Sequence, residues 1–393
     1  MMGLIRPQAL IGLLATLLLG CSDDGETSRQ FTIEAAASAL PYEEQDATLG
    51  GTRGWIPPSP YLLYGDLNTG SYKNYRNLTE SSIDVFFAKD GSTTPLHGRL
   101  RREQQSNTEE WKWKLALTEN SGTITAGDYY VYGFIPRDVA DDASIARLDE
   151  SSSYHDGAVL TIKGLKTVTP DACVIIGAKD GQDENTVSGL RAGDFGFKLR
   201  EGDNVTNYLF LLFDHLYSAL GISMKVDADY NALRTIKLRE ISLQPSSDDA
   251  VMKKKMDVTV TLQHNENGSS PISSVVFSTP TDATTMTASD GILYQSSEGI
   301  TLTTASQSFI SSFMPQGVTT LMLTSTYDVY DKKDNLIRKD CKATNKIELK
   351  KLISYFVEAE RGRKYTINMT IQPTYLYMLS EPDLDNPTLV VEN

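Results

Sequence analysis

Cysteine is scarce in this chain, which has only three cysteines in 393 residues. A small scaffold held together by disulfides needs several closely spaced cysteines, so a disulfide framework is excluded. Cys21 follows an apolar run near the N-terminus, which leaves Cys173 and Cys341 for the rest of the chain. Spacing alone does not decide connectivity, so two interpretations stay open: two independent thiols, or one bridge between them.

Basic residues are also in deficit. The chain has 37 lysines and arginines against 51 aspartates and glutamates, a formal net charge of −14. A protein that binds phosphate backbones needs a basic surface, so the sequence predicts no nucleic-acid partner. The acidic balance instead suits a soluble, exposed protein that does not adhere to anionic lipid.

Motifs for catalysis are missing. The sequence has no paired-cysteine motif, no histidine pair at metal-ligand spacing, no glycine-rich phosphate loop and no nucleophile elbow. His215 follows Asp214, and it is either a base tuned by that carboxylate or a histidine held in a strand or turn by backbone hydrogen bonds. The second interpretation is favoured, because the sequence brings no nucleophile into view. We therefore predict that the protein is not an enzyme.

Three acidic pairs are candidate calcium ligands or paired carboxylates. They lie in turn-like segments, where aspartate is favoured because its side chain hydrogen-bonds the nearby backbone. The turn interpretation is preferred, and we expect neither a metal nor a cofactor. The pairs are Asp227 with Asp229, Asp248 with Asp249, and Asp383 with Asp385.

The N-terminus has the pattern of a lipoprotein signal. Arg6 is followed by an apolar run from Ala9 to Leu19, then by Gly20 and Cys21. A run this short does not span a bilayer, which takes about 20 residues, so we predict a signal peptide over residues 1–20 that is cut before Cys21. Acyl chains such as palmitate on Cys21 would anchor the protein, since each buried CH₂ contributes roughly 0.8 kcal/mol. The alternative is an ordinary secretory signal with a coincidental cysteine.

Residues 21–53 are predicted to form a tether or propeptide with one short apolar island at residues 31–33. The tether ends in a glycine-rich stretch that a protease could reach. Beyond it the chain consists mainly of short apolar or alternating runs separated by turns, which predicts an all-β protein. The predicted strands lie within residues 111–115, 129–135, 158–165, 173–176, 258–262 and 365–371.

Two local patterns refine this prediction. The alternation changes register between Leu238 and Ile241, which predicts a β-bulge near Arg239 or Glu240. Residues 349–356 carry apolar side chains at helical spacing.

The charged run at residues 200–204 is the predicted domain boundary, because a chain of this length exceeds what one core usually organises. It separates an N-terminal β-sandwich domain over residues 54–202 from a C-terminal one over residues 203–393, which includes a tail strand.

Three segments, together with the lipoprotein signal and the acidic pair Asp23 and Asp24, are similar to a known family. They are residues 213–226 (FDHLYSALGISMKV), 230–238 (YNALRTIKL) and 362–371 (GRKYTINMTI). In order and spacing they resemble an aromatic-x-His segment at the start of a C-terminal domain, the strand that follows it, and the Gly-Lys-Tyr start of a late strand. The chain thus resembles the fimbrillin-like lipoproteins of Bacteroidales, the subunits of type V pili.

The resemblance implies two transthyretin-like β-sandwich domains in tandem, export to the outer face of the outer membrane, and a cut by an arginine-directed protease. The matching bond is Arg53–Gly54, with Arg29 as the competing site. In the family this cut releases an N-terminal strand, and a strand from a neighbouring subunit fills the groove. The candidate donor strand in the tail consists of Leu389, Val390 and Val391.

The implied partners are other pilus subunits, of the same or a related chain, and the outer membrane through the lipid anchor. A host or bacterial surface ligand is a further candidate, because the subunit is expected to take part in adhesion.

Alternatives remain for the tail and for the subunit. The tail either is donated or completes the subunit's own sheet, and residues 381–387 depart from the commonest family ending, which leaves shaft, tip and anchor roles open. An anchor would keep its lipid and stay uncut. A stand-alone surface lipoprotein could instead bind glycans through Trp55, Trp111 and Trp113. A surface hydrolase has the least support.

Overall fold

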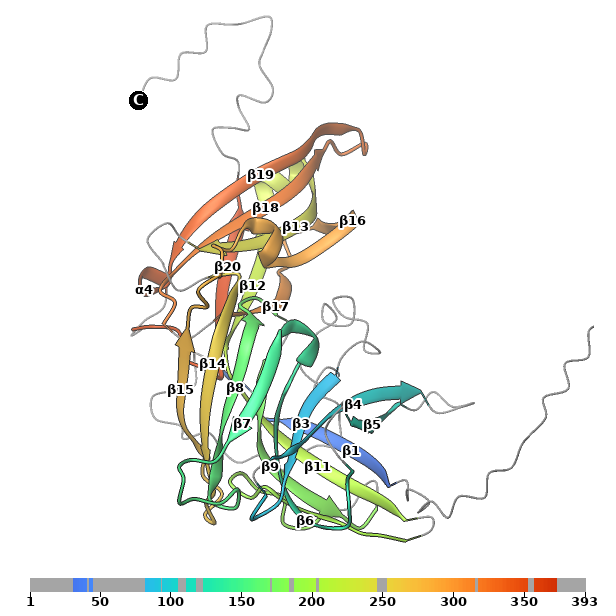
Figure 1. Cartoon of the computed structure of the whole chain (residues 1–393). Helices are drawn as coiled ribbons and strands as arrows, with labels where there is room; N and C mark the ends of the chain where they lie inside the picture. The colour runs from blue at the N-terminus through green and yellow to red at the C-terminus, as the bar shows by residue number, and fades with distance from the viewer. Residues whose placement is uncertain are drawn as a thin grey trace, which may run out of the picture. The chain divides into compact units, whose positions relative to one another are not determined.

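The computed structural model of the chain describes residues 31–40, 42–44, 82–92, 94–104, 111–117, 123–169, 172–183, 187–202, 205–245, 253–314, 317–352 and 357–372. Strands dominate these residues, and the fold is all-β, as predicted (Figure 1). Within the same ranges, no helix has the length and hydropathy to cross a membrane.

The first hydrophobic core lies between two sheets. The larger sheet has eight strands in the order β10-β6-β3-β4-β5-β1-β11-β9, and β6 also pairs with β9, so the sheet closes on itself. These strands are β1 (Thr32–Ala39), β3 (Ser82–Ala88), β4 (Leu96–Gln104), β5 (Trp111–Leu117), β6 (Gly127–Ile135), β9 (Cys173–Gly181), β10 (Gly196–Leu199) and β11 (Thr206–His215). The smaller sheet has the order β15-β14-β8-β7. Its strands are β7 (Asp142–Ala146), β8 (Gly157–Lys166), β14 (Lys255–Gln263) and β15 (Ile272–Ser278).

The second hydrophobic core also draws on two sheets, each of four strands. One has the order β17-β12-β20-β2 and the other β16-β13-β18-β19. The first comprises β2 (Glu43–Glu44), β12 (Ser218–Val226), β17 (Gln307–Met314) and β20 (Arg363–Ile371). The second comprises β13 (Thr235–Pro245), β16 (Ile292–Leu302), β18 (Thr320–Tyr330) and β19 (Leu336–Glu348). The helical elements are the 3-10 turns η1 (Arg137–Val139) and η2 (Ala288–Gly291) and the short helices α3 (Ala228–Leu233) and α4 (Leu349–Leu352).

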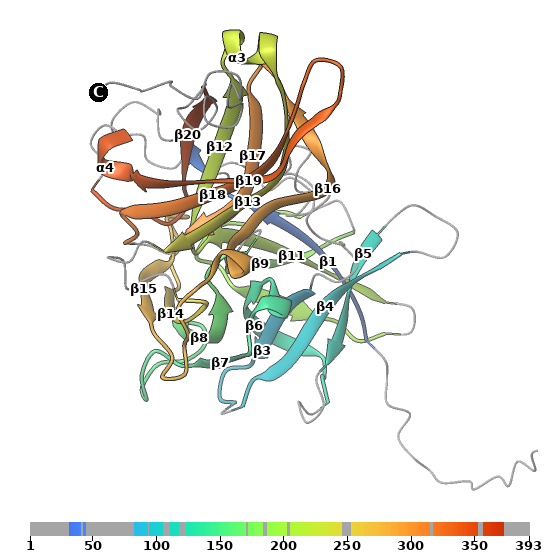
Figure 2. The same cartoon turned by 90° about the horizontal axis from the view of Figure 1, so that it is seen from above.

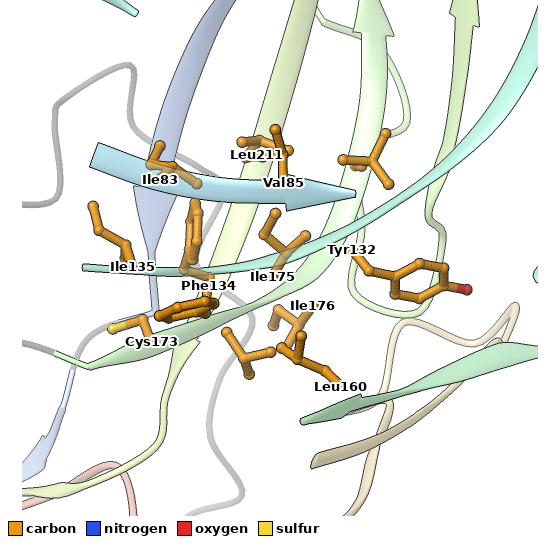
Figure 3. Close-up of a cluster of buried hydrophobic side chains, with 14 of the residues drawn as sticks. Ile83, Val85, Tyr132, Phe134, Ile135, Leu160, Cys173, Ile175, Ile176 and Leu211 are labelled. Atoms are coloured by element: carbon orange, nitrogen blue, oxygen red, sulfur yellow. The ribbon is translucent and has the colours of Figure 1, made fainter. Parts of the chain in front are cut away.

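The apolar pattern of each strand follows the number of faces that it buries. In β14, Val258, Val260 and Leu262 are buried while the residues between them are partly exposed, so one face of the strand contacts the core. In contrast, β9 and β11 are covered on both faces and have unbroken apolar runs. Figure 3 shows Ile175 and Ile176 of β9 in the same cluster as Leu211 of β11. The strands predicted from these patterns are confirmed.

The predicted β-bulge is confirmed in β13. Its pairing with both β16 and β18 shifts register between Leu238 and Glu240. The residue between them, Arg239, donates from Nη1 to Oδ2 of buried Asp328 at 2.9 Å and from Nε to the carbonyl oxygen of Ser296 at 3.2 Å. The bulge therefore aims a cation at a carboxylate that would otherwise be buried without a charged partner.

Two other local predictions can be compared with the structure. Asp227 caps α3, because its Oδ1 accepts hydrogen bonds from the backbone N–H groups of Asp229 and Tyr230; this supports the turn interpretation of that acidic pair. The helical segment expected at residues 349–356 begins as α4, and residues 353–356 lie outside the described residues.

Strand pairing crosses the domain boundary that the sequence predicts after Gly202. Strand β11 pairs with β9, and β14 pairs with β8 from Lys255 opposite Lys166 to Gln263 opposite Gly157. Such long-range pairing cannot be read from local alternation, because a strand pattern specifies which face is buried and not which strand lies alongside. The division into two domains and the tandem transthyretin-like arrangement stay predictions.

Candidate functional site

A strand from the predicted tether lies inside the larger sheet of the first core. Strand β1 runs parallel to β11 through eight residue pairs, from Thr32 opposite Thr206 to Ala39 opposite Phe213. On its other side it pairs with β5 antiparallel through only two. Figures 1 and 2 both show β1 alongside β11. We call residues 31–44 the leader segment, because they precede the predicted cut at Arg53.

The leader segment is poor in large side chains. Within β1, Ile33 is 2% exposed and Ala37 is 1% exposed, while Ala35, Ala36 and Ala39 are partly buried. Alanine has a low strand propensity, and its single methyl group contributes far less on burial than the roughly 1.5–3 kcal/mol of a large aliphatic side chain. The strand therefore depends mainly on its backbone ladder with β11 and on Ile33.

The same segment continues into the second core. The backbone N–H of Leu40 donates to the carbonyl oxygen of Phe213 at 2.9 Å, and β2 then pairs parallel with the start of β20. The register sets the acidic residues of β2 opposite Arg363 and Lys364. One short stretch of chain thus supplies a strand to a sheet of each core.

His215 is the last residue of β11, just before the chain enters β12 of the second core, and it contacts the leader segment twice. Its Nε2 lies 2.8 Å from the carbonyl oxygen of Leu40, and its ring stacks on the ring of Tyr42 with a centroid distance of 3.5 Å and an angle of 18°. On the far side, Nδ1 lies 3.1 Å from Sγ of Cys173. A carbonyl only accepts, so in the neutral imidazole Nε2 carries the hydrogen and Nδ1 accepts from the thiol.

The corner that holds His215 is tied to the second core. Asp214, fully buried, accepts a hydrogen bond from Nη1 of Arg361 at 2.7 Å and another from the backbone N–H of His215. The backbone N–H of Gly362 donates to the carbonyl oxygen of Tyr217 at 2.8 Å. Burial raises the pKa of the Tyr217 phenol far above its ordinary value, so this side chain is neutral in the folded protein.

The favoured interpretation of His215 is confirmed, because its ring is held by a backbone carbonyl. Sequence reasoning missed Cys173 as its neighbour. The two residues come from paired strands, with His215 opposite Cys173 in the register of β11 and β9. No local motif predicts which residues form a cross-strand pair, because an alternating pattern does not specify the partner strand.

The predicted processing and donor residues lie outside the described residues. These are Cys21, Arg53, Gly54, Leu389, Val390 and Val391. The same holds for Trp55, for the pairs Asp248–Asp249 and Asp383–Asp385, and for the side chains of Trp111 and Trp113, although the backbone of both tryptophans belongs to β5. Lipidation, cleavage, strand donation and glycan binding therefore stay predictions.

Of the two interpretations of Cys173 and Cys341, the structure supports two independent thiols, because no disulfide joins them. Burial raises the pKa of the partly buried Cys341 thiol. His155 and His264 are brought together by the fold, with ring centroids 4.5 Å apart, although they are distant in sequence. Even so, the described part of the chain holds no group of three or more side chains placed to bind a metal.

One polar cavity of about 630 Å³ lies beside β8 and β14. Two of its lysines already have carboxylate partners within the protein, because Nζ of Lys255 lies 2.5 Å from Oδ1 of Asp141 and Nζ of Lys254 lies 2.6 Å from Oδ1 of Asp290. The leader segment is therefore the better candidate site.

Comparisons with known proteins leave the family of this chain open. No family model matches it, and no curated protein does. Among solved structures, a candidate cell adhesion protein from Bacteroides fragilis is 10% identical and matches 88% of this chain and 94% of its own, with a TM-score of 0.40. A fimbrial protein from Bacteroides ovatus is 9% identical and matches 88% and 51%, with a TM-score of 0.26.

The fimbrial anchor protein Mfa2 from Porphyromonas gingivalis is 10% identical and matches 86% of this chain and 90% of its own, with a TM-score of 0.24. All three TM-scores lie below 0.5. These likenesses therefore establish neither a shared fold nor a shared function.

Proposed function

We propose that the protein is a structural subunit of a cell-surface pilus that is exported as a lipoprotein, cut at Arg53–Gly54 and polymerised by strand exchange. The observation that carries this proposal is the position of the leader segment. It supplies β1 to one core and β2 to the other, and it precedes Arg53 in the chain. A single cut there leaves both strands attached to the rest of the subunit only by non-covalent contacts.

Loss of the leader segment would leave a slot between β5 and β11. The backbone groups of residues 206–213 that pair with β1 would lose their partners, and the apolar surface that contacts Ile33 and Ala37 would be exposed. Such an edge aggregates unless it is filled. A strand from a neighbouring subunit restores the ladder, and each large apolar side chain that it buries contributes roughly 1.5–3 kcal/mol.

The experiment is a comparison of Arg53→Ala with the matched control Arg29→Ala in the cell that exports the protein. We expect the wild type and Arg29→Ala to yield a lipid-free protein that begins at Gly54 and forms SDS-resistant polymers, because release of a donated strand requires slow unfolding. Arg53→Ala should remain lipidated and monomeric. Mass spectrometry and N-terminal sequencing of protein sheared from the cell surface give the readout.

Two results would contradict the proposal. If the Arg53→Ala variant still forms normal polymers with an N-terminus at Gly54, maturation does not depend on Arg53. A wild-type protein that keeps acyl chains on Cys21 would instead indicate an uncut anchor subunit or a stand-alone surface lipoprotein.

A further inference from the structure

The geometry points to His215 as a recognition residue that fixes the register of whichever strand occupies the slot between β5 and β11. It binds two features of that strand: a backbone carbonyl, and an aromatic ring two residues farther along the chain. In the present structure these features are supplied by Leu40 and Tyr42 of the leader segment. Where it concerns a replacement strand, the inference rests on the proposed strand exchange.

The first feature, the carbonyl contact, is selective because Cys173 fixes the orientation of the His215 ring from the side opposite the leader segment. Cys173 contacts Nδ1 at 3.1 Å, and both residues are fully buried. With Nδ1 accepting from the thiol, Nε2 presents a hydrogen toward the slot. A strand shifted by one residue would turn its carbonyl away from this donor, because successive carbonyls in a strand point in opposite directions.

The second feature, the ring stack, adds side-chain selectivity. The centroid distance of 3.5 Å and the small angle leave no room for another group between the rings of Tyr42 and His215. Four of the eight positions of β1 are alanines, whose small side chains supply little register information of their own. Without the ring, an alanine-rich strand is prone to slip.

The replacement strand therefore has a defined chemistry. It runs parallel to β11, presents small or medium apolar side chains to the core at alternate positions, and carries an aromatic residue two positions after the carbonyl that faces Nε2 of His215. Segments that lack this aromatic residue should enter the slot more weakly.

The first test uses the uncut full chain with Cys21→Ser and Cys341→Ser, so that Cys173 is the remaining thiol. Cys173 lies beneath His215, and its labelling by a maleimide reports opening of the leader segment at this point. We expect Tyr42→Ala to accelerate labelling about threefold to tenfold, as loss of one aromatic pair implies. Tyr42→Phe, which keeps the ring, should be labelled at the same rate as the chain that carries only the two serine substitutions.

Tyr130→Ala is the matched control. It removes another tyrosine that contacts a histidine ring, that of His155, at a centroid distance of 5.4 Å. Tyr130 belongs to β6, so its loss tests general loosening of the same core. Equal acceleration by Tyr42→Ala and Tyr130→Ala, or none by Tyr42→Ala, would overturn the role of His215.

The second test uses the full chain cut after Arg53 and a fluorescent peptide with the sequence of residues 31–44. We expect this peptide to exchange into the slot, and a Tyr42→Ala peptide to exchange about threefold to tenfold more weakly. Equal entry of both peptides would overturn the inference and leave strand exchange intact. Entry of neither would contradict the proposed strand exchange, and the labelling of the uncut chain would then decide the role of His215 by itself.

Discussion

At the scale of single residues, buried polar groups sit where separate parts of the chain meet. Asp214 joins the end of β11 to Arg361. Asp328 joins the bulge of β13 to β19, because it also accepts from the backbone N–H of Asp340 at 2.8 Å. Burying a carboxylate is costly unless it is paired and hydrogen-bonded. Since a buried ion pair often adds little net stability, we infer that these residues act mainly by specifying which segments come together.

The buried phenol of Tyr217 gives a prediction about pH. Burial keeps its pKa far above the value of about 10 that holds in the unfolded chain, so above pH 10 the unfolded state has lost a proton that the folded state keeps. The free energy of unfolding should fall as the pH rises past about 10, by about 1.4 kcal/mol per pH unit for this group. Tyr217→Phe should show a shallower fall in urea unfolding measured between pH 9 and 11.

Tyr132, which is also buried and has a raised pKa, offers a second variant for the same measurement. Tyr132→Phe should reduce the slope in the same direction. Identical slopes in the wild type and both variants would show that neither phenol is withheld from ionisation by the fold.

At residue scale, sequence reasoning was right about the kind of contact that His215 makes and missed the identity of its neighbour. The local sequence contains Asp214 and His215 side by side, so a polar corner could be inferred from it. Cys173 reaches the same corner only through the pairing of β9 with β11. A cross-strand neighbour becomes visible once register is known, and register depends on the whole sheet.

At the scale of elements, β1 differs from the strands around it. Strands β9 and β11 carry large apolar side chains on both faces, while half of the residues of β1 are alanines. Its position between two strands thus owes little to its own propensity. Under the proposed strand exchange, replacing β1 would cost less free energy than replacing β9 or β11, because β1 buries fewer large side chains.

Ile33→Ala is the substitution that tests this difference. It removes the one large side chain that β1 buries fully, and we expect docking of β1 to weaken by about 2–5 kcal/mol. Hydrogen exchange of the β1 amides should accelerate accordingly, while exchange in β14 should change little. Thr32→Ala, at an exposed position of the same strand, is the control. Uniform acceleration across both strands would mean that β1 does not open on its own.

Alternation explains which elements could be predicted. Strands β14 and β20 bury one face and have a clear period of two, and the bulge of β13 appears as a change of phase. Strand β1 has no such signal, because a small side chain marks neither a buried nor an exposed position. Its residues were therefore predicted to belong to a tether with an apolar island, whereas in the structure they form a strand between β5 and β11.

At the scale of the whole molecule, the leader segment holds on through two separate ladders. Eight residue pairs join β1 to β11, and two join β2 to β20. After a limited cut at Arg53, we expect the leader fragment to stay with the subunit in size-exclusion chromatography and to separate in denaturant. The Arg53→Ala chain under the same protease is the control. Immediate loss of the fragment without denaturant or an added strand would contradict this.

The short apolar or alternating runs between turns predicted an all-β chain and several of its strands, but they did not predict how the four sheets would form. The pairings of β8 with β14 and of β1 with β11 each join residues from distant parts of the sequence. These contacts are specified by complementary surfaces in three dimensions, and no short window of sequence contains both surfaces.

The pairing of β8 with β14 also sets an order of events during biosynthesis. Half of the smaller sheet in the first core comes from β14 and β15, which leave the ribosome long after β3 to β9. The early half of the chain cannot bury its apolar faces by itself while it is being made. We expect part of its apolar surface to stay uncovered until residues 255–278 have been made.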